Sequence, residues 1–242
     1  MSAVRVVRDA ADLARTAAEH VAARAAEAIA ARGRCNLVLA GGETPRAAYG
    51  LLASEAFAGR VDWGRVQFFW GDERCVPPDD PRSNYRTARE ALLDRVRVPS
   101  ENVHRIRGED DPTGAAAAYD RLLRDMPGRF DLVLLGMGAD GHTASLFPGH
   151  AAVRERVRLA LAERMEPVDM WRVTLTPPAF NAARDVLFLV AGAGKAETLA
   201  RVLEAPREPE LLPAQSIAPA QGELTWLVDA QAAARLAQTA RG

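Results

Sequence analysis

Two titratable side chains that lie close together in the sequence are the strongest candidates for chemistry. Asp140 and His142 both occur in the stretch 130–149, FDLVLLGMGADGHTASLFPG, within a turn rich in glycine. The residues before that turn, 131–135, are apolar without polar alternation, which is typical of a strand covered on both faces by helices. Ligands of open α/β sheets bind where such strands end. The stretch therefore predicts a ligand site at the carboxyl end of a central parallel strand.

Two other interpretations of this stretch stay open at this point. Gly136, Gly138 and Gly141 have the G-x-G-x-x-G spacing of a dinucleotide site, but only six residues separate Gly141 from Pro148. Those residues are too few for the long helix that such a fingerprint opens, so a nucleotide cofactor is not favoured. A purely structural turn, with His142 capping a neighbouring element, is the simpler alternative. The residues of the other loops distinguish a ligand site from these two alternatives.

The loop 41–45, Gly-Gly-Glu-Thr-Pro, has the pattern of an anion site. A buried strand over 35–40 precedes it, and we expect Thr44 to cap the helix that begins at Pro45. Free amides and the positive end of the helix dipole then face one point, and two glycines let a phosphate approach the backbone closely. We therefore expect phosphate binding here, with an ordinary capped turn as the alternative.

Charged residues follow two further predicted strands. The strand expected over 66–70 ends in Gly71-Asp72-Glu73-Arg74, and a buried strand over 185–191 leads to Lys195. Parallel strands bring these ends to one edge of the sheet, as a cleft requires, although charged triplets usually lie on the surface. Lys195 is the only lysine among 31 basic residues, so the position either needs a compact ammonium or has kept it by chance.

The composition is that of an ordinary globular protein. Of the 242 residues, 48% are hydrophobic and 26% charged, and the net charge of −1 provides no field that attracts nucleic acid or anionic lipid. Cys35 and Cys75 form no C-x-x-C pair and have no metal-like spacing with the four histidines. No apolar run reaches about 18 residues, and the first ten residues contain no signal-peptide core. We expect one cytoplasmic domain over 1–242, without metal, cofactor, nucleic-acid partner or membrane partner.

Alternating strand and helix patterns predict an α/β fold with a mostly parallel central sheet. Asp9 and Gly33 bound a long alanine-rich helix, Ser83 caps another, and a crossover helix over 113–126 leads into the central strand. Further strands are expected over 4–7, 102–107, 157–162, 171–175 and 223–228, followed by a C-terminal helix.

Four sequence blocks, in order along nearly the whole chain, make it resemble the 6-phosphogluconolactonases of the glucosamine-6-phosphate deaminase-like superfamily. The blocks are LAGGETPRAAY, FFWGDERCVPPDDPRSNY, DLVLLGMGADGHTASLFPG and WRVTLTPPAFNAARDVLFLVAGAGKAETL. Each block alone is a modest signal, whereas four at compatible spacing are a strong one. The resemblance implies a Rossmann-like, three-layer α/β fold that hydrolyses 6-phospho-D-glucono-1,5-lactone in the pentose phosphate pathway, with no metal and no nucleotide.

The resemblance also implies which residues bind the phosphorylated sugar lactone. It assigns the 6-phosphate to the loop after the second strand and to a lysine, with an arginine as helper: Gly41, Gly42, Glu43, Thr44, Lys195 and Arg172. The oligomeric state is not implied, and we expect a monomer or a weak homo-oligomer.

The implied chemistry centres on His142 as the base that activates water. An imidazole suits this task because its ordinary pKa of about 6.5 lets it accept a proton at neutral pH. Asp140 orients the imidazole or the water, while Asp72 and Arg74 line the pocket near the lactone ring. Either Arg74 or the amides of the glycine turn, at Gly138, stabilise the oxyanion. The sequence leaves that choice open.

Three rival functions fit the sequence less well. Glucosamine-6-phosphate deaminases/isomerases continue this turn with an acidic residue, whereas this chain has Thr143-Ala-Ser-Leu-Phe-Pro148. In the deaminase reaction, the opening of the sugar ring and the shuttling of protons need that extra carboxylate, whereas hydrolysis of a lactone does not. A non-catalytic sugar-phosphate sensor would add a helix-turn-helix and a basic face, and neither is found. A nucleophile at Ser145 would need a glycine-flanked elbow, which is missing.

Overall fold

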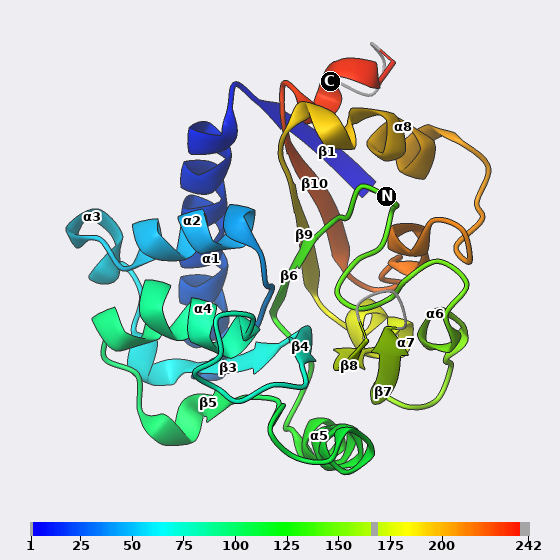
Figure 1. Cartoon of the computed structure of the whole chain (residues 1–242). Coiled ribbons are helices and arrows are strands. Elements are labelled where there is room, and N and C mark those ends of the chain that lie inside the picture. Colours follow the sequence, from blue (N-terminus) through cyan, green and yellow to red (C-terminus); the bar gives the residue numbers. More distant parts are fainter. Residues whose placement is uncertain (1, 166–168, 238–242) are drawn as a thin grey trace.

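A parallel sheet of seven strands runs through the middle of the protein in the computed structural model, which describes residues 2–165 and 169–237 (Figure 1). From edge to edge the strands are β1 (Ser2–Val7), β10 (Glu223–Asp229), β9 (Asp185–Val190), β6 (Leu132–Gly136), β2 (Cys35–Leu39), β3 (Val66–Trp70) and β5 (Val103–His104). Every neighbouring pair is parallel, and β6 is the middle strand. The expected α/β fold, with a central strand before the glycine turn, is confirmed.

Helices cover both faces of this sheet and give the fold three layers. They are α1 (Ala10–Arg32), α2 (Glu43–Leu52), α3 (Glu55–Ala58), α4 (Asn84–Ala91), α5 (Pro112–Asp125), α6 (Ala151–Arg154), α7 (Pro177–Asn181) and α8 (Ala196–Glu204). In Figure 1, α1 and α2 lie on one side of the sheet and α8 lies on the other. Within the two described ranges, no helix is long and apolar enough to cross a membrane.

The boundaries of two helices follow from their flanking residues, as the sequence predicts. Asp9 caps α1 by accepting a hydrogen bond from the amide of Asp12 at 2.8 Å, and Gly33 ends the helix at φ 76°. A glycine at this position adopts the left-handed conformation without the steric cost of a Cβ. Ser83 caps α4 in the same way as Asp9, through the amide of Arg86 at 3.1 Å.

Helix α2 begins earlier than the sequence pattern predicts. Gly42, at φ 101°, is the residue before the helix, and the first helical hydrogen bond runs from the amide of Arg46 to the Gly42 carbonyl at 3.1 Å. The prediction that Thr44 caps this helix is wrong, because a glycine with positive φ turns the chain directly into the first turn. The open amides of that turn therefore belong to Glu43 and Thr44, since Pro45 has none.

A second sheet packs beside the carboxyl end of β3; the sequence predicts two of its strands, over 157–162 and 171–175, but not that they form a separate sheet. Its three antiparallel strands are β4 (Asp72–Arg74), β8 (Met170–Leu175) and β7 (Ala160–Met165). A strand of three residues such as β4 is too short to show the alternation of polar and apolar side chains that predicts a strand, so the charged triplet was not predicted as one. The pairing matters for function because it sets Arg74 directly opposite Arg172.

Two other segments differ from expectation. The strand expected over 102–107 is only the two residues of β5, because the chain turns away at the edge of the sheet. The C-terminal helix expected after β10 is a single 3-10 turn, Ala232–Arg235, and residues 238–242 lie outside the described part of the chain.

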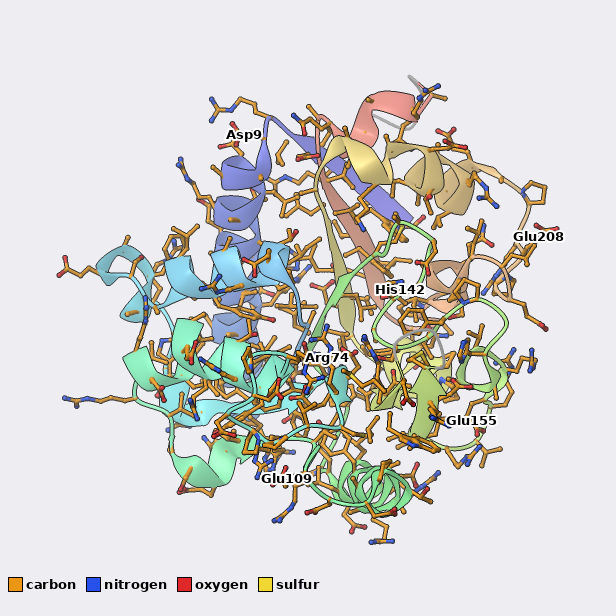
Figure 2. The ribbon with its side chains drawn as sticks, viewed as in Figure 1. Asp9, Arg74, Glu109, His142, Glu155 and Glu208 are labelled. Atoms are coloured by element: carbon orange, nitrogen blue, oxygen red, sulfur yellow. The ribbon has the colours of Figure 1, made fainter. Side chains whose placement is uncertain are left out.

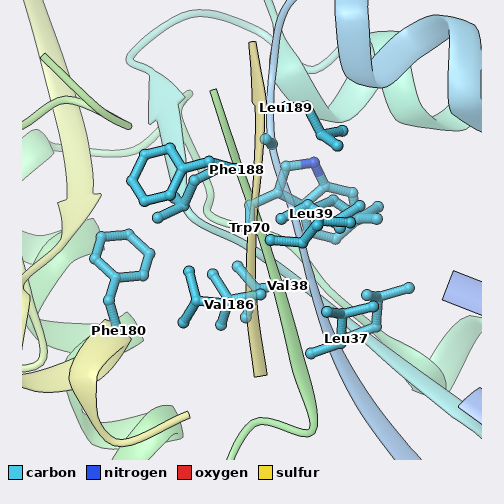
Figure 3. Close-up of a cluster of buried hydrophobic side chains, with 14 of the residues drawn as sticks. Leu37, Val38, Leu39, Trp70, Phe180, Val186, Phe188 and Leu189 are labelled. Carbon is cyan, nitrogen blue, oxygen red and sulfur yellow. The ribbon is translucent and has the colours of Figure 1, made fainter. Parts of the chain in front are cut away.

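The core lies along the central strands and holds their ends in place. Figure 3 shows side chains of β2 and β9 in one apolar cluster with Trp70 and Phe180. Leu39, Phe180 and Phe188 are completely buried, and burial of each such side chain contributes about 1.5–3 kcal/mol. Strands packed this tightly present the loops at their carboxyl ends on a rigid base.

Candidate active site

A cavity of about 230 Å³ opens where β2, β3 and β6 end, at the edge that the sequence predicts. In the view of Figure 2, His142 and Arg74 lie near the middle of the molecule. Eight predicted site residues line the cavity: Gly41, Gly42, Asp72, Arg74, Gly138, His142, Arg172 and Lys195. The remaining lining consists of Ala40, Gly71, Asn84, Leu134, Leu135, Gly136, Met137 and Ala144.

The glycine turn after β6 folds tightly around His142. The amide of Gly138 donates to the His142 carbonyl at 2.8 Å, and the Thr143 hydroxyl donates to the Gly136 carbonyl at 2.8 Å. A Cβ added to Gly138 would lie 2.1 Å from His142 Nδ1 and 2.6 Å from Asp140 Oδ1, so only glycine leaves room for these side chains. Because the Gly138 amide is already engaged, it is a poor donor for an oxyanion, and Arg74 is favoured.

Asp140 holds one edge of the His142 ring. Its Oδ1 lies 2.5 Å from Nδ1 of His142 and also accepts the His142 amide at 3.1 Å. Burial works to raise the pKa of Asp140, but the amide and the charge of His142 outweigh it and lower that pKa. An ionised carboxylate only accepts hydrogen bonds, so in the neutral form of the imidazole Nδ1 carries the proton and Nε2 keeps its lone pair. Asp140 is half exposed and does not line the cavity, so it acts through His142.

The glycines after β2 bring backbone to the cavity, whereas the side chains that follow point elsewhere. A Cβ on Gly41 would lie 2.0 Å from Asn84 Oδ1, which explains the requirement for glycine there. The Glu43 side chain is 87% exposed and pairs with Arg46 at 3.1 Å. Neither Glu43 nor Thr44 lines the cavity, so these two predicted residues can serve a ligand only through the open amides of the first turn of α2.

Three cationic side chains line the cavity, and Asp72 is the one carboxylate among its lining residues. The Nε atoms of Arg74 and Arg172 are buried and have no hydrogen-bond partner in the described structure. Burial lowers the pKa of Arg172, Asp72 opposes this from 3.8 Å, and Arg74 adds to the lowering. Lys195 forms no hydrogen bond or ion pair with any described side chain. The excess of positive charge favours an anionic ligand.

Asp72 is engaged by neighbouring donors rather than free to take a substrate proton. Its Oδ2 accepts the Ser145 hydroxyl at 2.6 Å, and its Oδ1 accepts the Asn84 side-chain amide at 3.0 Å. Ser145 is completely buried and does not line the cavity, so its hydroxyl is not placed to attack a ligand. Asn84 is a lining residue that the sequence reasoning missed, although it stands in the resemblance block that also contains Asp72.

A buried carboxylate, Glu73, holds the segment that carries Asn84. Its two oxygens accept the amides of Arg74, Asn84 and Tyr85 at 2.7–2.8 Å and the Ser83 hydroxyl at 3.0 Å. Burial raises the pKa of Glu73 in spite of those amide hydrogen bonds. The carboxylate thereby joins β4 to the start of α4, and both elements contribute to the cavity wall.

Metal-ligating side chains do not gather at this cavity. Within residues 2–165 and 169–237, no group of three or more His, Cys, Asp or Glu side chains has the arrangement needed to hold a metal ion. Cys75 is half buried, and burial raises the pKa of its thiol to about 11. Such a thiol stays protonated at neutral pH, and Cys75 does not line this cavity.

Comparisons with known proteins find similar sequences over most of the chain. A family model described as glucosamine-6-phosphate isomerases/6-phosphogluconolactonase matches residues 8–226. A 6-phosphogluconolactonase from Nostoc sp. is 43% identical in an alignment of 217 positions that covers 86% of this chain and 88% of that protein. One from Mycobacterium tuberculosis is 38% identical in an alignment of 247 positions that covers 97% of this chain and 98% of that protein.

Solved structures give the same result. A 6-phosphogluconolactonase from Thermotoga maritima has a TM-score of 0.83 at 32% identity, covering 95% of this chain and 100% of that one. The enzyme of the same name from Trypanosoma brucei has a TM-score of 0.87 at 28% identity, covering 98% and 99%. A monomeric glucosamine-6-phosphate deaminase, with a TM-score of 0.84 at 21% identity over 96% and 99%, shares the fold.

Proposed function

This chain belongs to the glucosamine-6-phosphate isomerase/6-phosphogluconolactonase family, and we propose that it hydrolyses 6-phospho-D-glucono-1,5-lactone to 6-phospho-D-gluconate in the pentose phosphate pathway. One observation carries the proposal. The imidazole of His142, held by Asp140 at 2.5 Å, lines a cavity together with Arg74, Arg172 and Lys195. A neutral base among cations suits an ester that carries a phosphate, because the cations bind the anion while the base activates water.

The first step is attack of water on the lactone carbonyl. Nε2 of His142 takes a proton from a water molecule as its oxygen forms a bond to C1, and the carbonyl electrons move to the carbonyl oxygen. Asp140 keeps Nε2 directed into the cavity and balances the charge of the imidazolium that forms. A lactone is an activated ester, so this step needs no covalent nucleophile from the protein.

The second step opens the ring. The tetrahedral oxyanion collapses, the bond between C1 and the ring oxygen breaks, and the imidazolium returns its proton to that oxygen as it leaves. The products are a carboxylic acid, which ionises at neutral pH, and a hydroxyl group, and His142 is neutral again. Arg74 stabilises the oxyanion between these steps, because its cationic side chain lines the cavity and the Gly138 amide is already engaged.

The phosphate binds at the other source of positive charge. Lys195 approaches from the junction between β9 and α8, while the open amides of Glu43 and Thr44 begin α2. An ammonium and the amino end of a helix together form a site for a phosphate dianion. Arg172 adds positive charge from the small sheet and assists in holding the phosphate.

The test is a coupled assay on freshly prepared 6-phosphoglucono-1,5-lactone, corrected for spontaneous opening of the ring. The protein is expected to accelerate hydrolysis well above that background, and to release no ammonia from glucosamine 6-phosphate under the same conditions. Ammonia release at a rate comparable with lactone opening would show that the chain is a deaminase. Failure to act on either compound, with both bound, would favour a sugar-phosphate sensor.

The assembly and location of the protein belong to the same proposal. The residues that line the cavity come from several segments of residues 1–242, and we expect one catalytic domain that acts as a monomer or a weak homo-oligomer. A phosphorylated substrate crosses lipid poorly because burial of its charge is costly, which supports a cytoplasmic location. Activity per chain that falls steeply on dilution, together with dissociation in gel filtration, would contradict a monomeric active unit.

A further inference from the structure

The side chain of Phe147 lies against the proposed base without lining the cavity. Its ring is stacked on the His142 imidazole, with centroids 4.3 Å apart and ring planes inclined by 28°. The guanidinium carbon of Arg172 lies 5.5 Å from the centroid of the same phenyl ring. One aromatic side chain therefore contacts two of the residues that line the cavity, and it does so from outside.

The backbone explains why these two rings meet. Thr143 and Leu146 form an antiparallel bridge, and the Leu146 amide donates to the Thr143 carbonyl at 2.9 Å. The next residues outward from such a bridge, His142 and Phe147, lie opposite each other, as cross-strand neighbours do. Ala144 has φ 48° within the turn, a conformation that a residue with a Cβ adopts only where the surrounding structure imposes it.

The segment after Phe147 is tied down, so the ring is held in place. Both oxygens of the Glu163 carboxylate accept backbone amides at the start of α6, from Ala151 at 2.8 Å and from Ala152 at 3.3 Å. The amide of Gly149 donates to the carbonyl of Glu210 at 2.8 Å. These contacts fix the chain on the carboxyl side of the phenyl ring, as the bridge does on its amino side.

We propose that Phe147 is a second positioning residue for the general base, beside Asp140, an inference that rests on the hydrolysis proposed above. Asp140 holds the imidazole at one edge, through Nδ1, and a single contact at an edge does not fix the plane of a ring. The stacked phenyl ring fixes that plane, so the two contacts together direct Nε2 at the water. When His142 gains the proton, the imidazolium faces the π electrons of Phe147, which favours the cation that the step produces.

The test compares Phe147→Leu, Phe147→Tyr and a control, Phe57→Leu, which makes the same change at a buried phenylalanine away from the cavity. Leucine keeps an apolar side chain but removes the aromatic face, whereas tyrosine restores it. Phe147→Leu is expected to lower kcat on the phosphorylated lactone about 3- to 10-fold with KM changed less than about twofold. Phe147→Tyr should recover kcat to within about twofold, and Phe57→Leu should leave both constants unchanged.

A spectroscopic readout tests the stack independently of activity. The ring protons of His142 are shielded by a stacked phenyl ring, so their NMR resonances, assigned by their loss in His142→Ala, should move downfield in Phe147→Leu and stay in place in Phe57→Leu. Unmoved resonances, or an equal loss of kcat in the leucine and tyrosine variants of folded protein, would overturn the proposal. A wild-type protein inactive on the lactone would instead overturn the proposed function, while the resonances still report on the stack.

Discussion

Replacing Lys195 by alanine is expected to lower kcat/KM for 6-phosphoglucono-1,5-lactone without an equal effect on the unphosphorylated lactone. The ammonium lines the cavity and forms no ion pair within the described chain, so its charge is available to a ligand. Its loop is held by Asp229, whose two oxygens lie 3.0 and 3.1 Å from the Gly192 amide. A charge-assisted hydrogen bond contributes about 1.5–3 kcal/mol, which corresponds to a decrease of about 10- to 150-fold.

The assay measures kcat/KM for both lactones on wild type, Lys195→Ala and Lys195→Arg. Arginine should recover only part of the loss, because a planar fork does not occupy the position of a compact ammonium beside backbone amides. Arg201→Ala is the matched control, since it removes an exposed cation from α8, the helix that follows Lys195, away from the cavity. That control should behave as wild type on both substrates.

The unphosphorylated lactone is the control that shows whether Lys195 acts on the phosphate. It has no phosphate for Lys195 to bind, so wild type and Lys195→Ala should hydrolyse it equally poorly. If Lys195→Ala lowers kcat/KM for both lactones by the same factor, Lys195 does not bind the phosphate and the proposed orientation of the substrate is wrong.

Three further outcomes are expected. Gly138→Ala should lower kcat about 100-fold while the protein stays folded by circular dichroism, because the new Cβ would lie 2.1 Å from His142 Nδ1 and displace the ring; normal kcat would contradict that close contact. Glu73→Gln should lower the free energy of unfolding in urea by about 1–3 kcal/mol, because the glutamine NH₂ group would face donors whose hydrogen bonds the carboxylate now accepts. Unchanged stability would mean that these hydrogen bonds contribute little. Treatment with EDTA should leave lactone hydrolysis intact, since the proposed steps use only side chains; activity lost on chelation and restored by a divalent ion would refute them.

Much of the fold could be predicted because the strands of the main sheet have a characteristic sequence pattern. Buried parallel strands such as β6 and β9 are continuous apolar runs, and Asp9 and Gly33 mark both ends of α1. The small sheet was missed because β4 is three residues long and its partner, β8, lies about a hundred residues away in the sequence. Pairing over such distances leaves no local signal in the sequence. That the chain forms one domain stays a prediction.

The sequence predicted which residues belong to the candidate site better than it predicted the contacts between them. Gly41, Gly138 and Lys195 were found from loop patterns at the ends of strands, and all three line the cavity. The start of α2 was placed too late, at Thr44, because the sequence does not show which glycine adopts a positive φ. Asn84 was missed because its place beside Gly41 depends on how α4 packs against the loop after β2.

The kcat of His142→Ala on 6-phosphoglucono-1,5-lactone, measured with the spontaneous reaction subtracted, tests the central claim most directly. A positioned general base contributes about 10²- to 10⁴-fold, so kcat should fall by that factor while KM changes little. The structure makes this a clean experiment, because the His142 side chain is 29% exposed and borders an open cavity, so its removal should not unfold the chain. A His142→Ala protein that turns over the lactone at nearly the wild-type rate would show that another group activates the water.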